Sequence, residues 1–348
     1  MRFYIQQHQY YCGIDLHART MYNCILDQAG NTLLHKNINT KPELFLKIIE
    51  PFRDNLVVAA ECIFTWYWLA DLCAKECIDF VLGHALYMKA IHGAKTKNDR
   101  IDSYKIAKLL RAGMIPMAYV YPAKMRSVRD LLRRRMHFMR KRAELRAHIK
   151  NTNSQYNLPP LGHTIPHRSN PDDVQAQFTD PCVHKSVQVD LDLIGYYDKM
   201  LKDLELYIHR IAKSHDAKDH YLLRTIPGIG PILSLVLLYE IENINRFPRV
   251  QNFSSYSRLI KPIKESAGKR TGKSNKKIGN AHLKWAFSEA AILMMRERDE
   301  AKKFVQRKQS KHGKAKAIAI LSHKIGRTVY YMLKHQRPFD PDKFFNKK

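Results

Sequence analysis

Three short apolar segments separated by turns open the chain, and this order restricts the possible folds more than any other feature of the sequence. Short apolar runs between turn residues are typical of buried strands. Three strands in succession, followed by alternating helices and strands, indicate an α/β domain with a mixed sheet. The predicted strands are 10–17, 20–27, 32–37, 56–60 and 78–82, and the predicted helices are 42–51, 66–76 and 99–112.

The middle of the chain changes to long amphipathic helices. Residues 124–150 contain eleven Lys and Arg, two acids and apolar residues at helical spacing, which predicts a basic helix. Residues 157–180 are rich in Pro, Gly, Ser, His and Asp and are interpreted as a linker before a second helix over 187–214. Two interpretations of this pair stay open: a coiled coil, as a hairpin or a dimer interface, or ordinary helices that pack on their own domain.

The last third is mostly helical. The segment TIPGIGP at 225–231 is a tight turn before a helix over 232–241, and further helices are predicted over 281–297 and 314–334. A basic stretch at 261–284 lies between them. We therefore expect three parts: an α/β domain at 1–122, basic coiled-coil helices with a central linker at 123–220, and a helical domain at 221–348.

The charge of the chain indicates its partner. Its 60 Lys and Arg against 32 Asp and Glu give a formal net charge of +28. Such an excess repels itself in a compact chain unless a polyanion offsets it, and nucleic acid is the usual polyanion because cationic side chains release counterions from its phosphates. A small ribosomal protein would rarely have 45% hydrophobic residues. A membrane-surface protein would concentrate its charge on one amphipathic helix, whereas here the charge is spread along the chain.

The six cysteines and the lengths of the apolar segments indicate in which cellular compartment the protein works. No CxxC pair and no Cys/His group with zinc spacing is present. No signal peptide is visible, and no apolar run approaches the roughly 18 residues of a membrane span. We expect a soluble, reduced protein without a membrane partner, in the cytoplasm of a prokaryotic cell and associated with the nucleoid when it acts.

Four acids lie at conspicuous places in the predicted α/β domain. Asp15 lies within an apolar strand, Glu61 follows the strand LVVAA, and Asp99 and Asp102 share a face at the start of a helix. A carboxylate in a core strand is costly unless it is paired or binds a metal. Four carboxylates from separate elements form an oxygen-rich site suited to Mg²⁺ or Mn²⁺. The sequence therefore predicts a metal site that contacts a phosphodiester.

Each acid also has a structural interpretation. Asp99 could stabilise the helix N-terminus, and Asp102 could pair with Arg100 or Lys105. Glu61 could be a buried acid paired with a basic side chain. Asp15 is the hardest of the four to explain without a ligand, and the order of all four favours the metal site.

These acids, in the contexts GIDL, AECIFTWYWLADL and KTKNDRIDSYKIAKLL, resemble the DEDD motif of insertion sequence 110 family transposases. In the C-terminal part, LLRTIPGIGPILSLVLLYEI and IKPIKESAGKRTGKSNKKIGNAHLKWAFSEAA resemble two further segments of that family, which Piv-type DNA invertases share. The resemblance covers most of the chain. It implies an RNase H-like (RuvC-like) N-terminal domain and a mainly α C-terminal domain.

The resemblance also implies a mechanism. The family uses a serine nucleophile in a stretch before a K-x-GN element, which corresponds to Ser266, with Ser274 as the alternative. It implies homo-oligomers, dimers or tetramers, that assemble two DNA duplexes. For several members it also implies a noncoding bridge RNA that pairs with donor and target DNA.

Basic residues and glycines make up the predicted nucleic-acid surface. Cations around the serine would hold a scissile phosphate, and glycine amides at a helix N-terminus can bind phosphate. A solvated helix face and a plain turn are the alternatives. The predicted binding residues are Arg133, Arg134, Arg135, Arg140, Lys141, Arg142, Gly228, Gly230, Lys264, Lys269, Arg270, Lys273, Lys276 and Lys277.

The sequence thus predicts a DNA transposase or site-specific recombinase that uses Mg²⁺ and a serine. Two other functions stay open. A metal-dependent nuclease or Holliday-junction resolvase would use water in place of Ser266. A non-catalytic nucleic-acid-binding protein would use only the basic surface and would not need Asp15 or Glu61.

Overall fold

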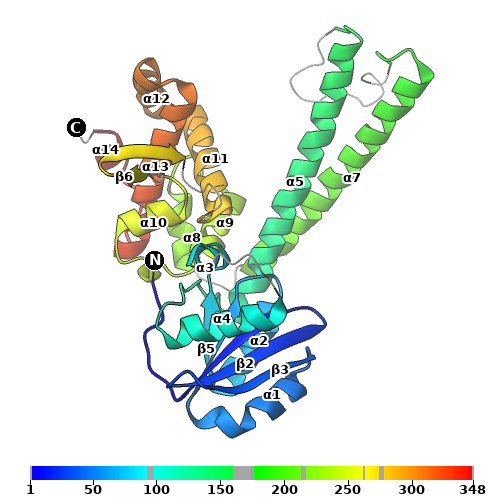
Figure 1. The fold of residues 1–348 in the computed structure, drawn as a ribbon. Coiled ribbons are helices and arrows are strands. Elements are labelled where there is room, and N and C mark those ends of the chain that lie inside the picture. The colour runs from blue at the N-terminus through cyan, green and yellow to red at the C-terminus, as the bar shows by residue number, and fades with distance from the viewer. Residues whose placement is uncertain are drawn as a thin grey trace. The chain divides into compact units, whose positions relative to one another are not determined.

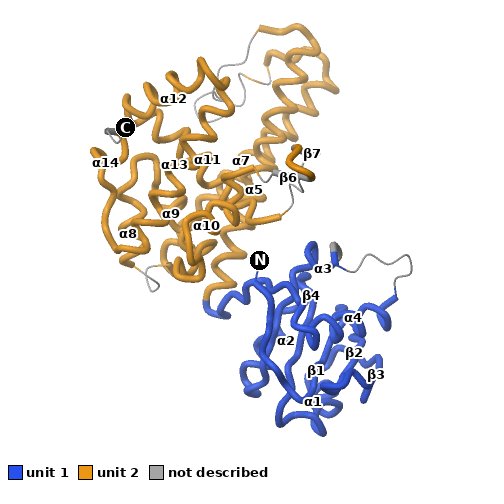
Figure 2. Tube along the Cα trace, turned by 60° about the vertical axis from the view of Figure 1, so that its left-hand side comes forward, with its two compact units in different colours: residues 1–124 blue, residues 125–348 orange. Residues whose placement is uncertain are grey.

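The chain forms two compact units, residues 1–124 and 125–348, in a computed structural model (Figures 1 and 2). The structure describes residues 2–91, 98–159, 174, 176–212, 217–261, 263–273 and 278–346. Among these, no helix combines the length and apolar character that crossing a membrane requires.

The first unit is built on a five-stranded sheet with the strand order β3-β2-β1-β4-β5. The first three strands pair antiparallel, and β1, β4 and β5 pair parallel, so the predicted mixed sheet is confirmed. The central strands β1 and β4 are buried on both faces, which explains their continuous apolar sequences. The strands are β1 (Tyr10–Leu16), β2 (Thr20–Asp27), β3 (Thr32–Asn39), β4 (Leu56–Glu61) and β5 (Asp79–Gly83).

Helices cover both faces of this sheet. Alternate residues of β1 and β4, such as Ile14 and Ala60, pack in one core with residues of α1 and α2. The other set, such as Tyr11 and Ala59, packs with residues of α4. This division follows from the two-residue period of a strand. The helical elements are α1 (Pro42–Ile49), η1 (Glu50–Asn55), α2 (Trp66–Lys75), α3 (Ala85–Ile91) and α4 (Asp99–Arg111).

The second unit is mainly helical and contains one two-stranded hairpin. Its largest core surrounds α9, where every residue from Leu233 to Ile241 is buried. Its elements are α5 (Ala123–Gln155), α7 (Pro181–Ala212), α8 (Ala217–Arg224), α9 (Pro231–Ile241), η2 (Ile244–Arg246), α10 (Val250–Tyr256), β6 (Ile263–Ser266), β7 (Lys269–Lys273), α11 (Ala281–Glu297), α12 (Asp299–His312), α13 (Lys314–His335) and α14 (Pro341–Asn346).

The long helices α5 and α7 run antiparallel, side by side in both views (Figures 1 and 2). Ion pairs join Arg135 to Glu205, Arg142 to Asp198 and His148 to Asp190, so residue numbers rise on one helix as they fall on the other. The first turns of α5 share a core with α9 and α11. The helix pair therefore belongs to the same compact unit as the C-terminal helices, and the division expected at residue 220 stays a prediction.

Candidate active site

Asp15 and Glu61 lie at the carboxyl ends of neighbouring parallel strands. Ile14 of β1 is in register with Ala60 of β4, so Asp15 and Glu61 are the next residues on each strand. Because successive side chains alternate between the faces of a sheet, both acids leave the face of Ile14 and lie on the face that α4 covers. The Asp15 side chain is 12% exposed, and Glu61 is half-buried.

Gly13 allows α4 to lie directly on β1. A Cβ atom at this position would lie 2.2 Å from the Ala107 backbone nitrogen and 2.4 Å from the Ser103 carbonyl oxygen. Only glycine permits this approach of helix to strand. Since Asp15 lies two residues beyond Gly13 on the same face, the approach brings the first turn of α4, with Asp99 and Asp102, toward the Asp15 carboxylate. This role of Gly13 was not predicted from the sequence.

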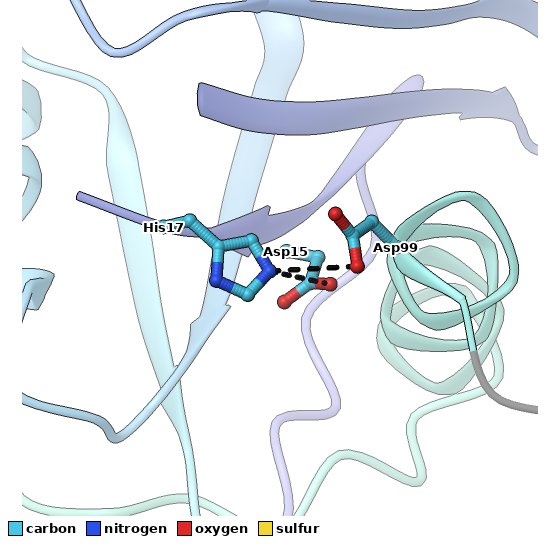
Figure 3. A group of neighbouring side chains, drawn as sticks. All are labelled: Asp15, His17 and Asp99. Carbon is cyan, nitrogen blue, oxygen red and sulfur yellow. Dashed lines mark ion pairs between the residues drawn. The ribbon is translucent and has the colours of Figure 1, made fainter. Parts of the chain in front are cut away.

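Asp15, His17 and Asp99 form a close group (Figure 3). The His17 Nε2 atom lies 3.3 Å from Asp15 Oδ2 and 3.6 Å from Asp99 Oδ1. All three side chains offer a ligand atom within 4.8 Å of the others. Glu61 and Asp102 are not in this group. His17 was not predicted from the sequence, although a histidine two residues beyond a buried strand acid was a signal that could have found it.

The structural interpretations of Asp99 and Asp102 have different outcomes. Asn98 caps α4, because its side chain accepts a hydrogen bond from the Ile101 amide at 2.8 Å, so the helix has its cap without Asp99. Asp102 lies 3.5 Å from the Lys105 amine, one of the two pairings the sequence suggested. Asp99 lies in the first turn of α4, where the helix dipole stabilises an acid, so this interpretation stays open beside the metal site.

The electrostatics of this group fit a divalent cation. Burial raises the pKa of Asp15, His17 lowers it, and the nearby charges of Asp99 and Asp102 raise it again. Acids that disfavour one another's charge are stabilised when a cation lies between them. Carboxylate oxygens are the donors that Mg²⁺ and Mn²⁺ prefer, and an imidazole is compatible with Mn²⁺ more than with Mg²⁺. The residues present therefore fit a divalent metal site.

Ser266 is the last residue of β6, in the β6–β7 hairpin. The hairpin turns at Ala267 and Gly268, which both have positive φ, +49° and +71°, as in the tight turns that join antiparallel strands. No strand was predicted in the basic stretch 261–284, so this hairpin is an addition to the helical domain expected there. The side chains of Ser266, Lys264, Arg270 and Lys273, and residues Ser274, Lys276 and Lys277, lie outside the described residues; Lys269 is exposed.

Buried Glu240 connects three elements of the second unit. Arg133 donates two hydrogen bonds to its carboxylate, at 2.6 and 2.9 Å, and Arg129 donates one at 3.1 Å. Asn280 donates another at 2.8 Å while its own oxygen accepts from the His282 and Leu283 amides and caps α11. Glu240 and Asn280 lie in the two segments that carried the family resemblance, so these segments hold α5, α9 and α11 together.

The negative charge of Glu240 is balanced by the positive charges of Arg129 and Arg133. Burial raises the pKa of Glu240, but the Arg133 hydrogen bonds and the charges of Arg129 and Arg133 lower it to about 2. The carboxylate is thus ionised at neutral pH. Burial and the same arginines lower the pKa of His282 to about 4, so its imidazole is neutral there.

The TIPGIGP turn packs against α11. The Gly228 amide donates to a Glu297 carboxylate oxygen at 2.7 Å, and a Cβ atom on Gly228 would lie 2.4 Å from the Met294 nitrogen. This amide is therefore engaged by an acid, which would also repel a phosphate, and the geometry does not support Gly228 as a phosphate ligand. Gly230 has open space around it and stays a predicted binding residue.

Acids within the second unit bind several of the predicted cations of α5. Arg133 binds Glu240, Arg135 binds Glu205 and Arg142 binds Asp198, and these three arginines are only partly exposed. Lys141 pairs with Glu144 on the surface. Arg134 lies over the Phe138 ring, and Arg140 donates to the Met136 sulfur. Exposed guanidinium groups on this helix are thus fewer than the sequence suggested.

Family comparisons agree with the geometry. Residues 12–157 match a model of DEDD transposases of the IS110 group, described as "Transposase", and residues 220–306 match one described as "Transposase IS116/IS110/IS902 family". The two matched segments are thus similar to domains of IS110-family transposases. The matches follow one another along the chain, and together they span more than half of it. No curated protein matches the chain.

The family match gives the fold and the substrate class. A DEDD transposase domain implies a RuvC-like fold, with which the mixed sheet of the first unit is consistent. Transposases act on DNA, and DEDD transposases typically use a divalent metal, which the donor atoms of Asp15, His17 and Asp99 suit.

Proposed function

We propose that the chain cuts and rejoins DNA with a divalent metal site on β1, β4 and α4 and with Ser266 as the nucleophile. The observation that carries the metal site is the approach of Asp99 to buried Asp15, beside His17. Two acids held this close without a matching Lys or Arg in the ligand group raise the energy of the fold, which is typical of functional sites.

Asp15, Asp99, Glu61 and Asp102 would hold Mg²⁺ or Mn²⁺, with His17 at the edge of the site. When bound, the ion supplies a positive charge that polarises a phosphoryl oxygen. Asp15 lies on a central strand and Asp99 on a capped helix that packs directly on it. The chain therefore positions these two carboxylates through rigid elements, which favours a fixed ligand geometry.

The serine step forms one bond and breaks one. The Ser266 Oγ attacks phosphorus and loses its proton, the bond from phosphorus to the 3′ oxygen breaks, and that oxygen takes up a proton. Rejoining reverses the step, when a 3′ hydroxyl of the partner strand attacks and releases the serine. Cations near Ser266 would offset the charge on the phosphate. Exposed Lys269, in register with Ser266, supports this role for the hairpin.

The test is a denaturing gel of the protein incubated with its element-end DNA, Mg²⁺ and co-expressed RNA. Wild type should form a covalent protein–DNA band that is lost in Ser266→Ala and in Asp15→Asn. Asp54→Asn and Ser255→Ala change an exposed acid and an exposed serine and should keep the band. Cleavage without a covalent band, unaffected by Ser266→Ala, would replace the serine step with a nuclease that uses water. In that case Ser274→Ala decides whether the alternative serine acts.

A guide RNA is a second part of the proposal. The excess of positive charge, +28, supports a second polyanion beside DNA. Exposed Arg134, Arg140 and Lys141 on α5 are the residues of that helix we assign to nucleic acid. Protein purified from its native host should carry a discrete noncoding RNA that ribonuclease removes together with strand transfer. Full strand transfer after ribonuclease treatment would exclude the guide.

Self-association is a third part. On α7, Val189, Leu193 and Tyr196 are exposed at intervals of four and three residues, as in a coiled-coil seam, and Leu206 and Tyr207 are exposed farther along the helix. A stripe with this spacing fits a second copy of the same helix pair. Light scattering should give a dimer or tetramer, and Leu193→Glu should shift it to monomer. Val305→Ala, which changes a buried core residue, controls for general destabilisation.

A further inference from the structure

The segment from Ala301 to His335 contains ten Lys and Arg and no acid. It forms most of α12 and α13, which pack side by side (Figure 1). Around the turn that joins the helices, five of these cations are exposed: Arg307, Lys308, Lys311, Lys314 and Lys316. We call these five residues the α12–α13 basic surface.

The cations of this surface have no acidic partner in the structure. Among the described residues, no ion pair involves any of the five, whereas four of the predicted cations of α5 pair with acids. The positive charge of these side chains also lowers the pKa of neighbouring cationic groups. Partial burial and then Lys316, Lys311 and Lys308 lower the pKa of His312, and burial and then Arg307 and Lys308 lower the pKa of Lys324. Concentrated unmatched charge destabilises a fold unless a polyanion offsets it.

The surface has the spacing of a phosphate-binding face. Lys303, Arg307 and Lys311 follow one another at four-residue intervals on one face of α12. At about 1.5 Å per residue they extend over about 12 Å. One DNA strand presents a phosphate about every 3.4 Å of helix axis, so this row can follow several phosphates.

The surface lacks the features of other anionic partners. Between residues 299 and 327, all of which are described, no large apolar side chain is exposed. Phe304 is half-buried, with the amines of Lys308 and Lys324 over its ring at 6.0 and 5.0 Å. A membrane-surface helix needs exposed apolar residues, and single-stranded RNA is typically bound by exposed aromatic rings. The phosphate backbone of a duplex needs neither.

We propose that the α12–α13 basic surface binds the phosphate backbone of duplex DNA. The proposal rests on the proposed function for its choice of DNA as the polyanion. It adds a binding surface near the C-terminus, beyond the residues that the sequence analysis assigned to nucleic acid. Because the contacts are to phosphates, they hold the duplex without reading its sequence.

The test compares three charge removals by measuring affinity for a mixed-sequence duplex about three helical turns long at several salt concentrations. The variant Arg307→Gln, Lys311→Gln, Lys314→Gln removes three cations of the surface. The variant Lys150→Gln, Lys185→Gln, Lys202→Gln removes three exposed lysines of α5 and α7 and is the charge-matched control. The variant Arg134→Gln, Arg140→Gln, Lys141→Gln tests the exposed cations of α5.

The surface variant should bind DNA about tenfold more weakly or worse in moderate salt, and the slope of log affinity against log salt should fall by about two to three. The control should keep the wild-type slope, and melting temperatures should stay the same or rise in the surface variant as repulsion is relieved. An unchanged slope in the surface variant would overturn the proposal. So would a loss confined to anionic phospholipid vesicles or to single-stranded RNA.

The same proteins are assayed for the covalent band, which separates this proposal from the proposed function. If wild type forms no band but the surface variant still loses duplex affinity, the chemistry is wrong and the binding surface stands. If wild type forms the band and the surface variant binds duplex normally, the surface is wrong and the chemistry stands.

Discussion

Each unit contains a buried carboxylate, and the charges that surround the two carboxylates are opposite in sign. In the first, Asp15 lies near two further acids, and burial and their charges raise its pKa. In the second, Glu240 lies among Arg129, Arg133 and Asn280, and its pKa falls to about 2. The second arrangement is complete without a ligand and holds helices together. The first sets three acids against Lys105 and half-exposed His17 in the contacts described above, and this difference separates a candidate catalytic site from a structural one.

The largest expected effect comes from removing one carboxylate of each kind. Glu240→Ala leaves Arg129 and Arg133 without their partner, so it should lower the free energy of unfolding by about 3–5 kcal/mol. Asp15→Asn should leave stability unchanged or slightly higher, because it removes a buried charge and its repulsion, while it abolishes the covalent band. Urea unfolding of both variants measures this contrast. Equal destabilisation by the two substitutions would contradict it, and Glu144→Ala on the surface should cost less than about 1 kcal/mol.

The second effect concerns acid stability. Because the pKa of Glu240 is about 2 in the folded chain and near 4.5 when unfolded, its ionised form stabilises the fold fully above pH 4.5. About 3 kcal/mol of this stabilisation should be lost as the pH falls from 4.5 to 2. Glu240→Gln removes the titration, so the stability difference between wild type and this variant should shrink over that range. A difference independent of pH would show that Glu240 is not ionised in the fold.

Asp15 should show the opposite sign. Its pKa is raised in the folded chain, so protonation favours the folded form, and lowering the pH toward its unfolded pKa should relieve local strain. Hydrogen exchange of β1 amides in wild type and Asp15→Asn should therefore converge as the pH falls. Divergence would place the Asp15 pKa below its ordinary value.

The third effect concerns the approach of α4 to β1. Gly13→Ala places a Cβ against the Ala107 and Ser103 backbones, so the helix must move away, at a cost of about 1–3 kcal/mol. The larger separation between Asp99 and Asp15 should also weaken Mn²⁺ binding, as measured by electron paramagnetic resonance. Gly230→Ala, in open space, is the control and should affect neither. Normal Mn²⁺ affinity in Gly13→Ala would show that this approach does not build the site.

The smallest effect concerns His17. Its side chain contacts both acids but is half exposed, so His17→Gln should reduce strand cleavage and Mn²⁺ affinity by about tenfold without lowering stability. Thr40→Ala, which removes a hydrogen bond to the His17 carbonyl, should have a weaker effect. Unchanged cleavage in His17→Gln would confine the site to carboxylates.

Much of the first unit could be predicted because its signals are local. The strands β1, β2 and β4 and the helix α4 begin and end within a residue or two of the predicted bounds, since apolar runs and turn residues define them. The sequence placed Asp15 and Asp99 near each other, at a strand end and a helix start, whereas Glu61 and Asp102, which it placed with them, lie outside the close group. Gly13 could not be predicted, because its role depends on a helix about ninety residues later in the chain.

The second unit was harder to predict for the same reason. A count of Lys and Arg cannot show which of them have acidic partners, and the acids that bind Arg133, Arg135 and Arg142 lie 56 to 107 residues away in the chain. The hairpin β6–β7 has short strands rich in charge and lacks an apolar alternation. The helix α12 is strongly polar, so too few apolar residues recur at helical spacing to predict it from the sequence.

Asn280 and Glu240 also lie where the anchored part of α5 ends. The first three turns of α5 are anchored in the core of the second unit through Met125, Val128 and Leu132. Beyond Arg133, the helix continues for 22 residues to Gln155, about 33 Å at 1.5 Å per residue, against about 12 Å from Met125 to Arg133. The part of α5 beyond Arg133 is thus nearly three times as long as the part anchored in the core. The Arg133–Glu240–Asn280 contacts lie at the base of this length, where α11 begins, directly after the segment that carries the serine.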